Sequence, residues 1–322
     1  MTKVDIISGF LGAGKTTFIK ELIEKVFAGE KLVLIENEFG EIGIDGGFLQ
    51  DAGIEITEMN SGCICCTLVG DFSVALKKVL DEYHPDHVII EPSGVGKLSD
   101  VAAAIENVKE DADIEIEGRI TVVDGKKAKM YLDNFGEFFE NQVEHASTIV
   151  ISRTQNMTDE KIEACVHLLR EKNDKATIIS TPWDQLSGDA IRHALEHGAE
   201  IEGLFEHHHD HDEECSCGCG HHHDHHHHHA DEVFTSWGKE TAHKYTEEEL
   251  DYLLKALSET DAYGTILRSK GIIQMADGNW KQFDLVPQEY EVRDGKADYA
   301  GRMVVIGTDL KEDELAKLFH VQ

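Results

Sequence analysis

The sequence predicts a doubly wound α/β domain with a mostly parallel sheet, followed by a smaller α+β domain. Over residues 1–205, short apolar runs alternate with helical patterns, which is the order of elements in a parallel sheet with crossover helices. Two of the runs, Val88–Ile90 and Ile149–Ile151, are apolar at successive positions. Such strands are covered on both faces, as in a parallel sheet. Over residues 231–322 the order changes, because amphipathic helices there accompany several alternating strands.

The periodicities place each element in turn. In the first domain we expect strands at Val4–Ser8, Leu32–Glu36, Ile54–Glu58, His87–Ile90, Ile120–Val123, Thr148–Ile151 and Ala176–Ile179. Crossover helices are expected at Phe18–Phe27, Ser73–Glu82, Asp100–Asn107, Glu160–Lys172 and Asp189–His197. In the second domain we expect helices at Glu247–Leu257 and Asp309–Phe319, and strands at Thr265–Lys270, Gly271–Ala276, Trp280–Val286, Glu289–Arg293 and Arg302–Gly307.

Composition narrows the classes of protein. A chain of 322 residues, 41% of them apolar, has room for about two domains with real cores. It contains no run of eighteen apolar residues and no signal-peptide pattern, so we expect a cytoplasmic protein. The net charge of −33 argues against nucleic acid and anionic membranes as partners and is compatible with binding cations. An adaptation for solubility or salt explains the acidity equally well.

The phosphate-binding loop is the strongest single motif. Positions 9–17 read G-F-L-G-A-G-K-T-T, between an expected strand and an expected helix. Glycines let the backbone wrap tightly and direct N–H groups at phosphate oxygens, and the helix adds its positive end. Lys15 is placed to reach the β- and γ-phosphates, and the Thr16 hydroxyl to ligate Mg²⁺. The chain is therefore expected to bind a nucleoside triphosphate.

Three cysteines follow the third expected strand. Positions 62–66 read G-C-I-C-C, so the thiols of Cys63, Cys65 and Cys66 can hold one soft cation from a short loop. After the second strand comes an acidic segment with Glu36 and Glu41, whose carboxylates could complete this metal site or could form a solvated turn.

A further turn, E-P-S-G at positions 91–94, follows the fourth strand. Glu91 there is suited to hold the Mg²⁺ shell through water, and Gly94 to offer its N–H to the γ-phosphate. A turn that merely ends the strand remains the alternative. Asp124, at the end of the fifth strand, is left without an assigned role.

Residues 206–230 interrupt the pattern. This segment has no apolar periodicity, holds twelve of the twenty histidines and contains Cys215, Cys217 and Cys219. We expect a disordered, metal-binding linker. Cys165, by contrast, lies in an apolar helical pattern and is expected to be part of the core.

These motifs together resemble the CobW-type GTPases, a metallochaperone branch of the phosphate-loop NTPases. The resemblance rests on positions 9–17, 36–45 (E-N-E-F-G-E-I-G-I-D), 62–66 and 91–94, and in the second domain on Arg268–Gly271, Trp280 and Gly301–Gly307. It implies GTP hydrolysis, with Lys15, Thr16 and Glu91 as catalytic residues, coupled to delivery of Zn²⁺ or Co²⁺. Phosphate-binding roles then pass to Gly12, Ala13, Gly14, Lys15, Thr16, Thr17 and Gly94, and metal ligation to Cys63, Cys65 and Cys66 with Glu36 and Glu41.

One motif departs from that family. The guanine-reading motif, usually Asn/Thr-Lys-x-Asp, here reads Ser152-Arg153-Thr154-Gln155. Gln155 offers one carbonyl acceptor instead of a carboxylate, and Arg153 can stack on the base in place of lysine. Loss of the charged acceptor would cost about 1–3 kcal/mol of base discrimination. We therefore expect GTP as the nucleotide, with weakened guanine selectivity.

Three functions fit these observations. The first is a GTP-driven metallochaperone whose partner is a client metalloprotein or a cobalt-using enzyme, with a dimer that forms on nucleotide or metal binding also compatible. The second is a metal store or sensor that uses the histidine–cysteine segment and is regulated by nucleotide. The third is a nucleotide-dependent thiol redox enzyme, which would require a redox-active pair among Cys63, Cys65 and Cys66. A store binds several ions regardless of nucleotide, whereas a chaperone has one tight site whose affinity changes with GTP.

Overall fold

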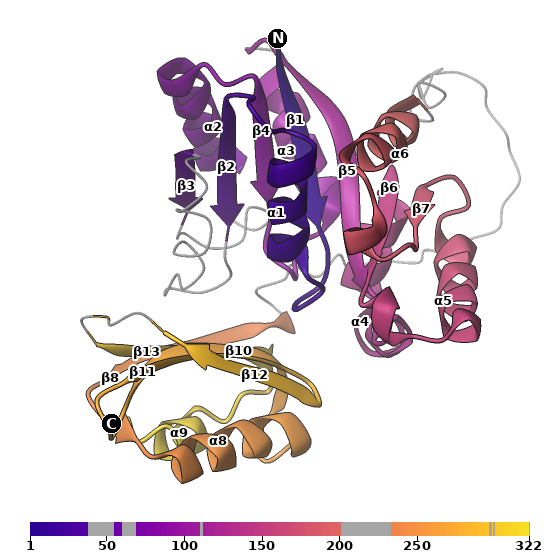
Figure 1. Ribbon diagram of the computed structural model, residues 1–322. Helices are drawn as coiled ribbons and strands as arrows, with labels where there is room; N and C mark the ends of the chain where they lie inside the picture. Colours follow the sequence, from indigo (N-terminus) through magenta and orange to yellow (C-terminus); the bar gives the residue numbers. More distant parts are fainter. Residues whose placement is uncertain are drawn as a thin grey trace, which may run out of the picture.

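The computed structural model describes residues 1–37, 55–59, 69–109, 112–200, 233–295, 298 and 300–321. Its first domain contains a seven-stranded sheet in the order β3-β2-β4-β1-β5-β6-β7, in which every neighbouring pair is parallel. Its second domain contains a mostly antiparallel sheet in the order β12-β11-β10-β13-β8, with β9 paired to β10. In Figure 1 the strand arrows of the first sheet point toward the second domain. The carboxyl edge, where ligands bind in such folds, therefore faces that domain.

The first domain has strands β1 (Thr2–Ser8), β2 (Leu32–Asn37), β3 (Glu55–Met59), β4 (His87–Glu91), β5 (Ile114–Asp124), β6 (Thr148–Ser152) and β7 (Thr177–Ile179). Its helices are α1 (Lys15–Lys25), α2 (Val69–Tyr83), α3 (Leu98–Lys109), α4 (Ala128–Glu144), α5 (Asp159–Lys172) and α6 (Gly188–Glu200). One apolar cluster packs α1 and α6 on one face, and a larger one packs α2 to α5 on the other. The doubly wound prediction is thus confirmed, and Cys165 is buried in the larger cluster.

Helix α4 was missed by the sequence reasoning. Its buried residues keep a helical spacing at both ends, but Asn134 and Gly136 interrupt the middle, and Phe135 has a non-helical backbone (φ −135°, ψ 36°). Strand β5 also begins earlier than the expected start at Ile120. Its first residues were missed because Glu115 and Glu117 break the apolar run at the amino end of the sheet. In both cases tertiary packing overrides a weak local pattern.

The second domain has strands β8 (Thr235–Thr241), β9 (Lys244–Tyr245), β10 (Thr265–Met275), β11 (Trp280–Val286), β12 (Glu289–Asp294) and β13 (Gly301–Thr308), and helices α8 (Glu247–Glu259) and α9 (Glu312–Leu318). The two strands expected on either side of Gly271 form one strand, β10. A Cβ on Gly271 would lie 2.4 Å from Phe283 Cε1, so the glycine lets this ring cross the strand. The short strands β8 and β9 were not predicted.

The two domains share an aromatic cluster. Phe234, just before β8, lies with its ring centroid 4.9 Å from that of Phe138 and 6.4 Å from that of Phe10 in the phosphate-binding loop. Burying such rings contributes a few kcal/mol each. The start of the second domain is therefore anchored against the core of the first.

Within the described ranges, no helix combines the length and apolar character needed to cross a membrane. The predicted domain boundaries at 205 and 230, and the predicted linker between them, fall outside these ranges and stay predictions.

Candidate nucleotide and metal site

The loop at positions 9–17 forms a cradle. Gly9, Gly12 and Gly14 have φ values of +142°, +69° and +101°, a region that side chains other than glycine rarely adopt. A Cβ on Gly9 would lie 2.2 Å from the carbonyl oxygen of Val122, so the loop presses against β5. Helix α1 begins immediately afterwards at Lys15. Glycines and a helix N-terminus thus meet where phosphate would bind, and the cradle fits that group.

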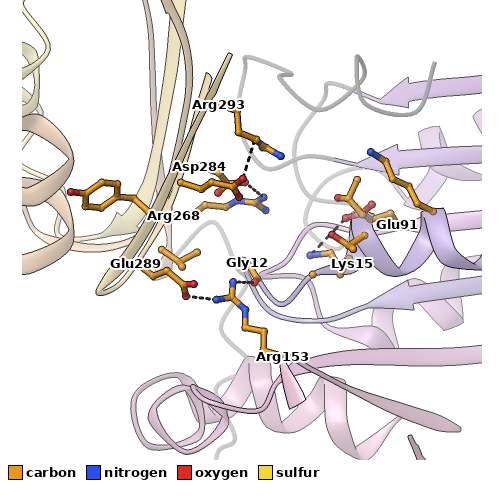
Figure 2. Close-up of a pocket in the computed structure, with 15 residues that line it drawn as sticks. Gly12, Lys15, Glu91, Arg153, Arg268, Asp284, Glu289 and Arg293 are labelled. Atoms are coloured by element: carbon orange, nitrogen blue, oxygen red, sulfur yellow. Dashed lines mark hydrogen bonds and ion pairs between the residues drawn. The ribbon is translucent and has the colours of Figure 1, made fainter. Parts of the chain in front are cut away.

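Lys15 lies in this cradle with only 5% of its surface exposed. Its Nζ donates to the carbonyl oxygen of Gly9 at 3.0 Å. The same atom is 3.9 Å from Glu91 Oε1 (Figure 2). The ammonium group is therefore held at the phosphate position by the loop itself. Thr16 and Thr17 follow in the first turn of α1 and line the same pocket.

Glu36 and Glu91 are neighbours at the carboxyl edge. Residues of β2 and β4 pair in parallel register, and Glu36 lies opposite Glu91. Glu36 is 8% exposed. Strand β3, on the other side of β2, ends at Met59 opposite Asn37, and the cysteine motif begins three residues later at Gly62. Glu41, Cys63, Cys65 and Cys66 lie outside the described residues, so their part in the site stays a prediction.

Helix α4 holds two loops of the site together. The Gln142 side-chain amide donates to the carbonyl oxygens of Gly94 at 3.1 Å and Gly96 at 2.8 Å. The Tyr131 hydroxyl donates to the carbonyl oxygen of Leu11 at 3.3 Å. A Cβ on Gly94 would lie 3.0 Å from the backbone nitrogen of Leu11. The predicted γ-phosphate turn therefore packs directly against the phosphate-binding loop.

Arg153 connects three parts of the site. Its backbone is left-handed (φ 63°), its Nη2 donates to the carbonyl oxygen of Gly12 at 3.5 Å, and its Nε lies 3.2 Å from Asp124 Oδ2. Its Nη1 also pairs with Glu289 of the second domain. Burial raises the pKa of Asp124, and Arg153 only partly offsets this. Burial acts in the same direction on Glu289, but Arg153 and nearby lysines outweigh it and lower the pKa of that carboxyl.

Ser152 and Gln155, the other two residues of the motif that we expect at the base, do not line the pocket with Arg153. Ser152 is buried and its hydroxyl donates to the carbonyl oxygen of Val123 at 3.3 Å. Gln155 lies exposed in a short 3-10 helix, η3 (Thr154–Asn156). Of this motif, only Arg153 lines the pocket. Contact between Gln155 and a base stays a prediction.

The second domain supplies one wall of the pocket, which the sequence did not predict. Strands β11 and β12 contribute Asp284, Val286, Glu289, Tyr290, Glu291 and Arg293, and β10 contributes Arg268. A Cβ on Gly12 would lie 2.3 Å from Val286 Cγ1, so the two domains touch at the phosphate-binding loop. Arg268 Nη2 is 3.0 Å from Asp284 Oδ2, and both side chains face the loop in Figure 2. Of the motifs found in the sequence analysis, only Arg268–Gly271 includes a residue of this wall.

Two family models match the chain. The CobW/HypB/UreG nucleotide-binding domain matches residues 3–180, and the cobalamin synthesis protein CobW C-terminal domain matches residues 234–321. The zinc chaperone CobW of Sinorhizobium sp is 37% identical over 177 residues, which cover 46% of this chain and 50% of that protein. The zinc chaperone YeiR of Escherichia coli (strain K12) is 30% identical over 203 residues, which cover 63% and 57%. The chain thus spans about half the length of these curated relatives.

Among solved structures, the Zn(II)-bound YjiA GTPase from E. coli aligns over 99% of this chain and 98% of its own, with 22% identity and a TM-score of 0.45. The hydrogenase maturation factor HypB from Archaeoglobus fulgidus aligns over 60% of this chain and 90% of its own, with 21% identity and a TM-score of 0.41.

Proposed function

The chain belongs to the CobW/HypB/UreG family of nucleotide-binding proteins, and on that premise we propose that it is a GTP-hydrolysing metallochaperone. It binds Zn²⁺ or Co²⁺ at its cysteine motif and delivers the ion to a client protein. The relatives named above as zinc chaperones support the choice of zinc.

One observation carries the proposal. The phosphate-binding loop, the Glu36–Glu91 pair and the end of β3 lie at the same edge of one parallel sheet. The end of β3, three residues before the cysteine motif in the sequence, is therefore separated from the nucleotide site only by neighbouring strands. On this proposal, a change at the γ-phosphate acts on the metal ligands through Glu36.

On this proposal, each residue of the phosphate-binding cradle has a role in nucleotide binding. Backbone N–H groups of Gly12, Ala13 and Gly14 bind phosphate oxygens, and Lys15 neutralises the developing charge. The remaining residues have the following roles: Thr16 ligates Mg²⁺, Thr17 and Gly94 donate hydrogen bonds to phosphate, Glu91 orients the Mg²⁺ shell through water, and Ser152, Arg153 and Gln155 contact the base. Bound GTP would supply the hydrolysable phosphoanhydride, and Mg²⁺ would offset the charge on its phosphates.

The metal is cargo. Thiolates of Cys63, Cys65 and Cys66 suit Zn²⁺ and accept Co²⁺ in tetrahedral geometry, with Glu36 or Glu41 as an oxygen ligand. The client is a metalloprotein, such as a cobalt-using enzyme, and assembly into a dimer on nucleotide or metal binding belongs to the same proposal. The chain holds a second set of donors in the histidine–cysteine segment, which on its own favours a store.

Zinc release during a single round of GTP hydrolysis tests the proposal. The full chain is loaded with Zn²⁺ and GTP, and released zinc is followed with a chromogenic chelator beside the formation of phosphate. A chaperone releases about one ion per chain in step with phosphate. The variant with Cys65→Ser and Cys66→Ser should hydrolyse GTP without that release. Zinc that leaves at the same rate with GDP would show a passive store.

A further inference from the structure

A group of metal-binding side chains lies in the second domain, away from the nucleotide pocket. It consists of His243, between β8 and β9, Glu249, in the first turn of α8, and His320, just after α9. One ligand atom from each of the three lies within 4.8 Å of the others. Figure 1 places α8 and α9 on the side of the antiparallel sheet that faces away from the first domain.

His320 is held in an uncommon conformation. Its φ is +53°, at the position after a helix where glycine is usual. The backbone N–H groups of His320 and Val321 donate to the carbonyl oxygens of Lys317 at 3.2 Å and Ala316 at 2.9 Å, which closes the helix end. The Tyr245 hydroxyl also donates to the carbonyl oxygen of Phe319 at 2.6 Å. A left-handed histidine costs about 1–2 kcal/mol relative to glycine, and strain of this kind often marks a functional position.

The two imidazoles face one another. The ring of His320 stacks on that of His243 with centroids 4.5 Å apart and an angle of 27° between planes. His243 Nε2 is buried, makes no hydrogen bond within the described residues, and lies 3.7 Å from Glu249 Oε2. A buried ring nitrogen without a donor or acceptor costs free energy, which a bound cation would recover.

The Glu249 carboxylate is held in place by the start of its own helix. Its Oε2 accepts the backbone N–H of Thr246 at 2.8 Å, and Thr246 Oγ1 accepts the backbone N–H of Glu249 at 3.2 Å. This capping box fixes the carboxylate at the start of α8.

We propose that His243, Glu249 and His320 form a second metal site, which binds Zn²⁺ or a similar borderline divalent cation independently of the cysteine motif. Two imidazoles and one carboxylate are a common zinc ligand set and leave one position for water. Hard cations such as Mg²⁺ and Ca²⁺ prefer oxygen ligands and are excluded by the histidines. Tetrahedral ligands lie roughly 3.4 Å apart, so the two imidazoles must rotate out of their stacked arrangement to bring their ring nitrogens onto one ion. The ion would join the β8–β9 turn, the start of α8 and the end of α9.

The test is a zinc titration of the full chain labelled with ¹⁵N-histidine, which resolves single imidazoles. The signals of His243 and His320 are identified by their loss in His243→Ala and His320→Ala. They should shift together with one binding curve, and amide exchange at Phe319 and His320 should slow as zinc binds. Glu249→Gln keeps the helix cap, since glutamine can also accept the Thr246 N–H, but should weaken binding at least about tenfold.

Two controls define the outcomes. His145→Ala removes an exposed histidine whose Nδ1 lies 3.0 Å from the carbonyl oxygen of Asn141 in the first domain, and it should leave both shifts unchanged. Cys63→Ser with Cys65→Ser and Cys66→Ser should do the same. The proposal is overturned if the two signals move independently or not at all when other histidines are saturated. It is also overturned if Glu249→Gln binds zinc as tightly as the parent, or if the cysteine substitutions abolish the shifts.

Discussion

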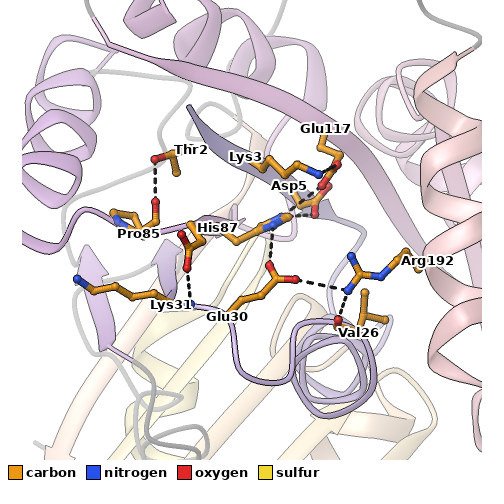
Figure 3. Close-up of polar contacts among 11 residues, drawn as sticks. Thr2, Lys3, Asp5, Val26, Glu30, Lys31, Pro85, His87, Glu117 and Arg192 are labelled. Atoms are coloured by element: carbon orange, nitrogen blue, oxygen red, sulfur yellow. Dashed lines mark hydrogen bonds and ion pairs between the residues drawn. The ribbon is translucent and has the colours of Figure 1, made fainter.

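The two edges of the parallel sheet both carry buried charged residues, but among the described residues these line a pocket at the carboxyl edge and pair with each other at the amino edge. At the carboxyl edge, Lys15 and Glu91 line a pocket whose far wall comes from the second domain. At the amino edge, His87 Nε2 lies 2.7 Å from Asp5 Oδ2, and Lys3 pairs with Glu117 (Figure 3). Both His87 and Asp5 are about 1% exposed. His87 and Asp5 thus pair with each other inside the protein, whereas Lys3 and Glu117 pair at its surface.

The amino-edge cluster also has the residue types of a metal site, since Asp5, His87 and Glu117 bring their ligand atoms together. Its surroundings argue against that use. The Lys3 ammonium contacts Glu117, and the ring of Phe27 lies over that of His87 with centroids 4.2 Å apart. A cation would have to displace the Lys3 ammonium from Glu117 and compete with the hydrogen bond between His87 and Asp5. Residue types alone therefore do not identify a site, and the difference lies in what fills the space beside them.

The largest effect is expected at the carboxyl edge. Lys15→Ala removes the charge that faces the phosphates and should lower the rate of GTP hydrolysis by at least about 10²–10³-fold. The fold should remain, because the Lys15 ammonium bonds to Gly9 and pairs with Glu91 at the pocket, and Lys15 belongs to neither apolar cluster of the first domain. Phosphate release and a thermal melt measure the two effects. Lys129→Ala, on the exposed side of α4, is the matched control and should change neither.

At the amino edge, the effect should be on stability. His87→Ala leaves Asp5 buried without its partner, which should cost about 3–5 kcal/mol in the free energy of unfolding. Denaturant unfolding measures this cost, with His145→Ala as the control. GTP affinity of the folded variant should equal that of the parent. A loss of GTP affinity without a loss of stability would show that the amino-edge cluster takes part in nucleotide binding, which contradicts the distinction between the two edges.

Arg153 tests the wall between the domains. Arg153→Ala removes the contacts with Gly12 and Glu289 and leaves Asp124 without its charge partner. Nucleotide affinity should fall by about tenfold, equivalent to roughly 1.4 kcal/mol, and Arg153→Lys should recover part of it. Equilibrium binding of a fluorescent GTP analogue measures the change. Equal affinity of Arg153→Ala and the parent would mean that the contact between domains does not shape the pocket.

The smallest effect is a pH dependence. Burial raises the pKa of Asp5 above its ordinary 3.8, with His87 opposing the shift. The native state therefore binds this proton more tightly than the unfolded state, so its contribution to stability is present below pH 3.8 and is lost as pH rises through the raised pKa. Asp5→Asn should flatten that part of the profile of unfolding free energy against pH. A profile parallel to that of the parent would show that Asp5 does not titrate differently in the folded state.

Local motifs predicted the cradle well, because each of its requirements is local. Gly9, Gly12 and Gly14 adopt positive φ, and Lys15 starts a helix, as the spacing of positions 9–17 predicts. The Glu36–Glu91 pairing also follows from sequence once a parallel sheet is assumed, since both residues end neighbouring strands.

The rest of the site depends on contacts between distant segments. Gln142 and Tyr131 hold the two phosphate loops, yet they lie on a helix whose pattern is broken at Phe135. Val286 and Glu289 reach the pocket only because the second domain docks there. Nothing in the local pattern of β11 or β12 reports that docking. The same reasoning applies to His243 and His320, which are 77 positions apart in the sequence.

The central claim is that nucleotide and metal are coupled at the carboxyl edge. Its most direct test is the Co²⁺ or Zn²⁺ affinity of the full chain at the cysteine motif, measured with a non-hydrolysable GTP analogue and with GDP. Co²⁺ reports this site alone through a thiolate charge-transfer band, once Cys215, Cys217 and Cys219 have been replaced by serine. We expect tighter binding with the GTP analogue by about 5- to 150-fold, and an equal tightening of the analogue by the metal. Equal metal affinities in the two nucleotide states, or a band that survives Cys65→Ser with Cys66→Ser, would contradict the account.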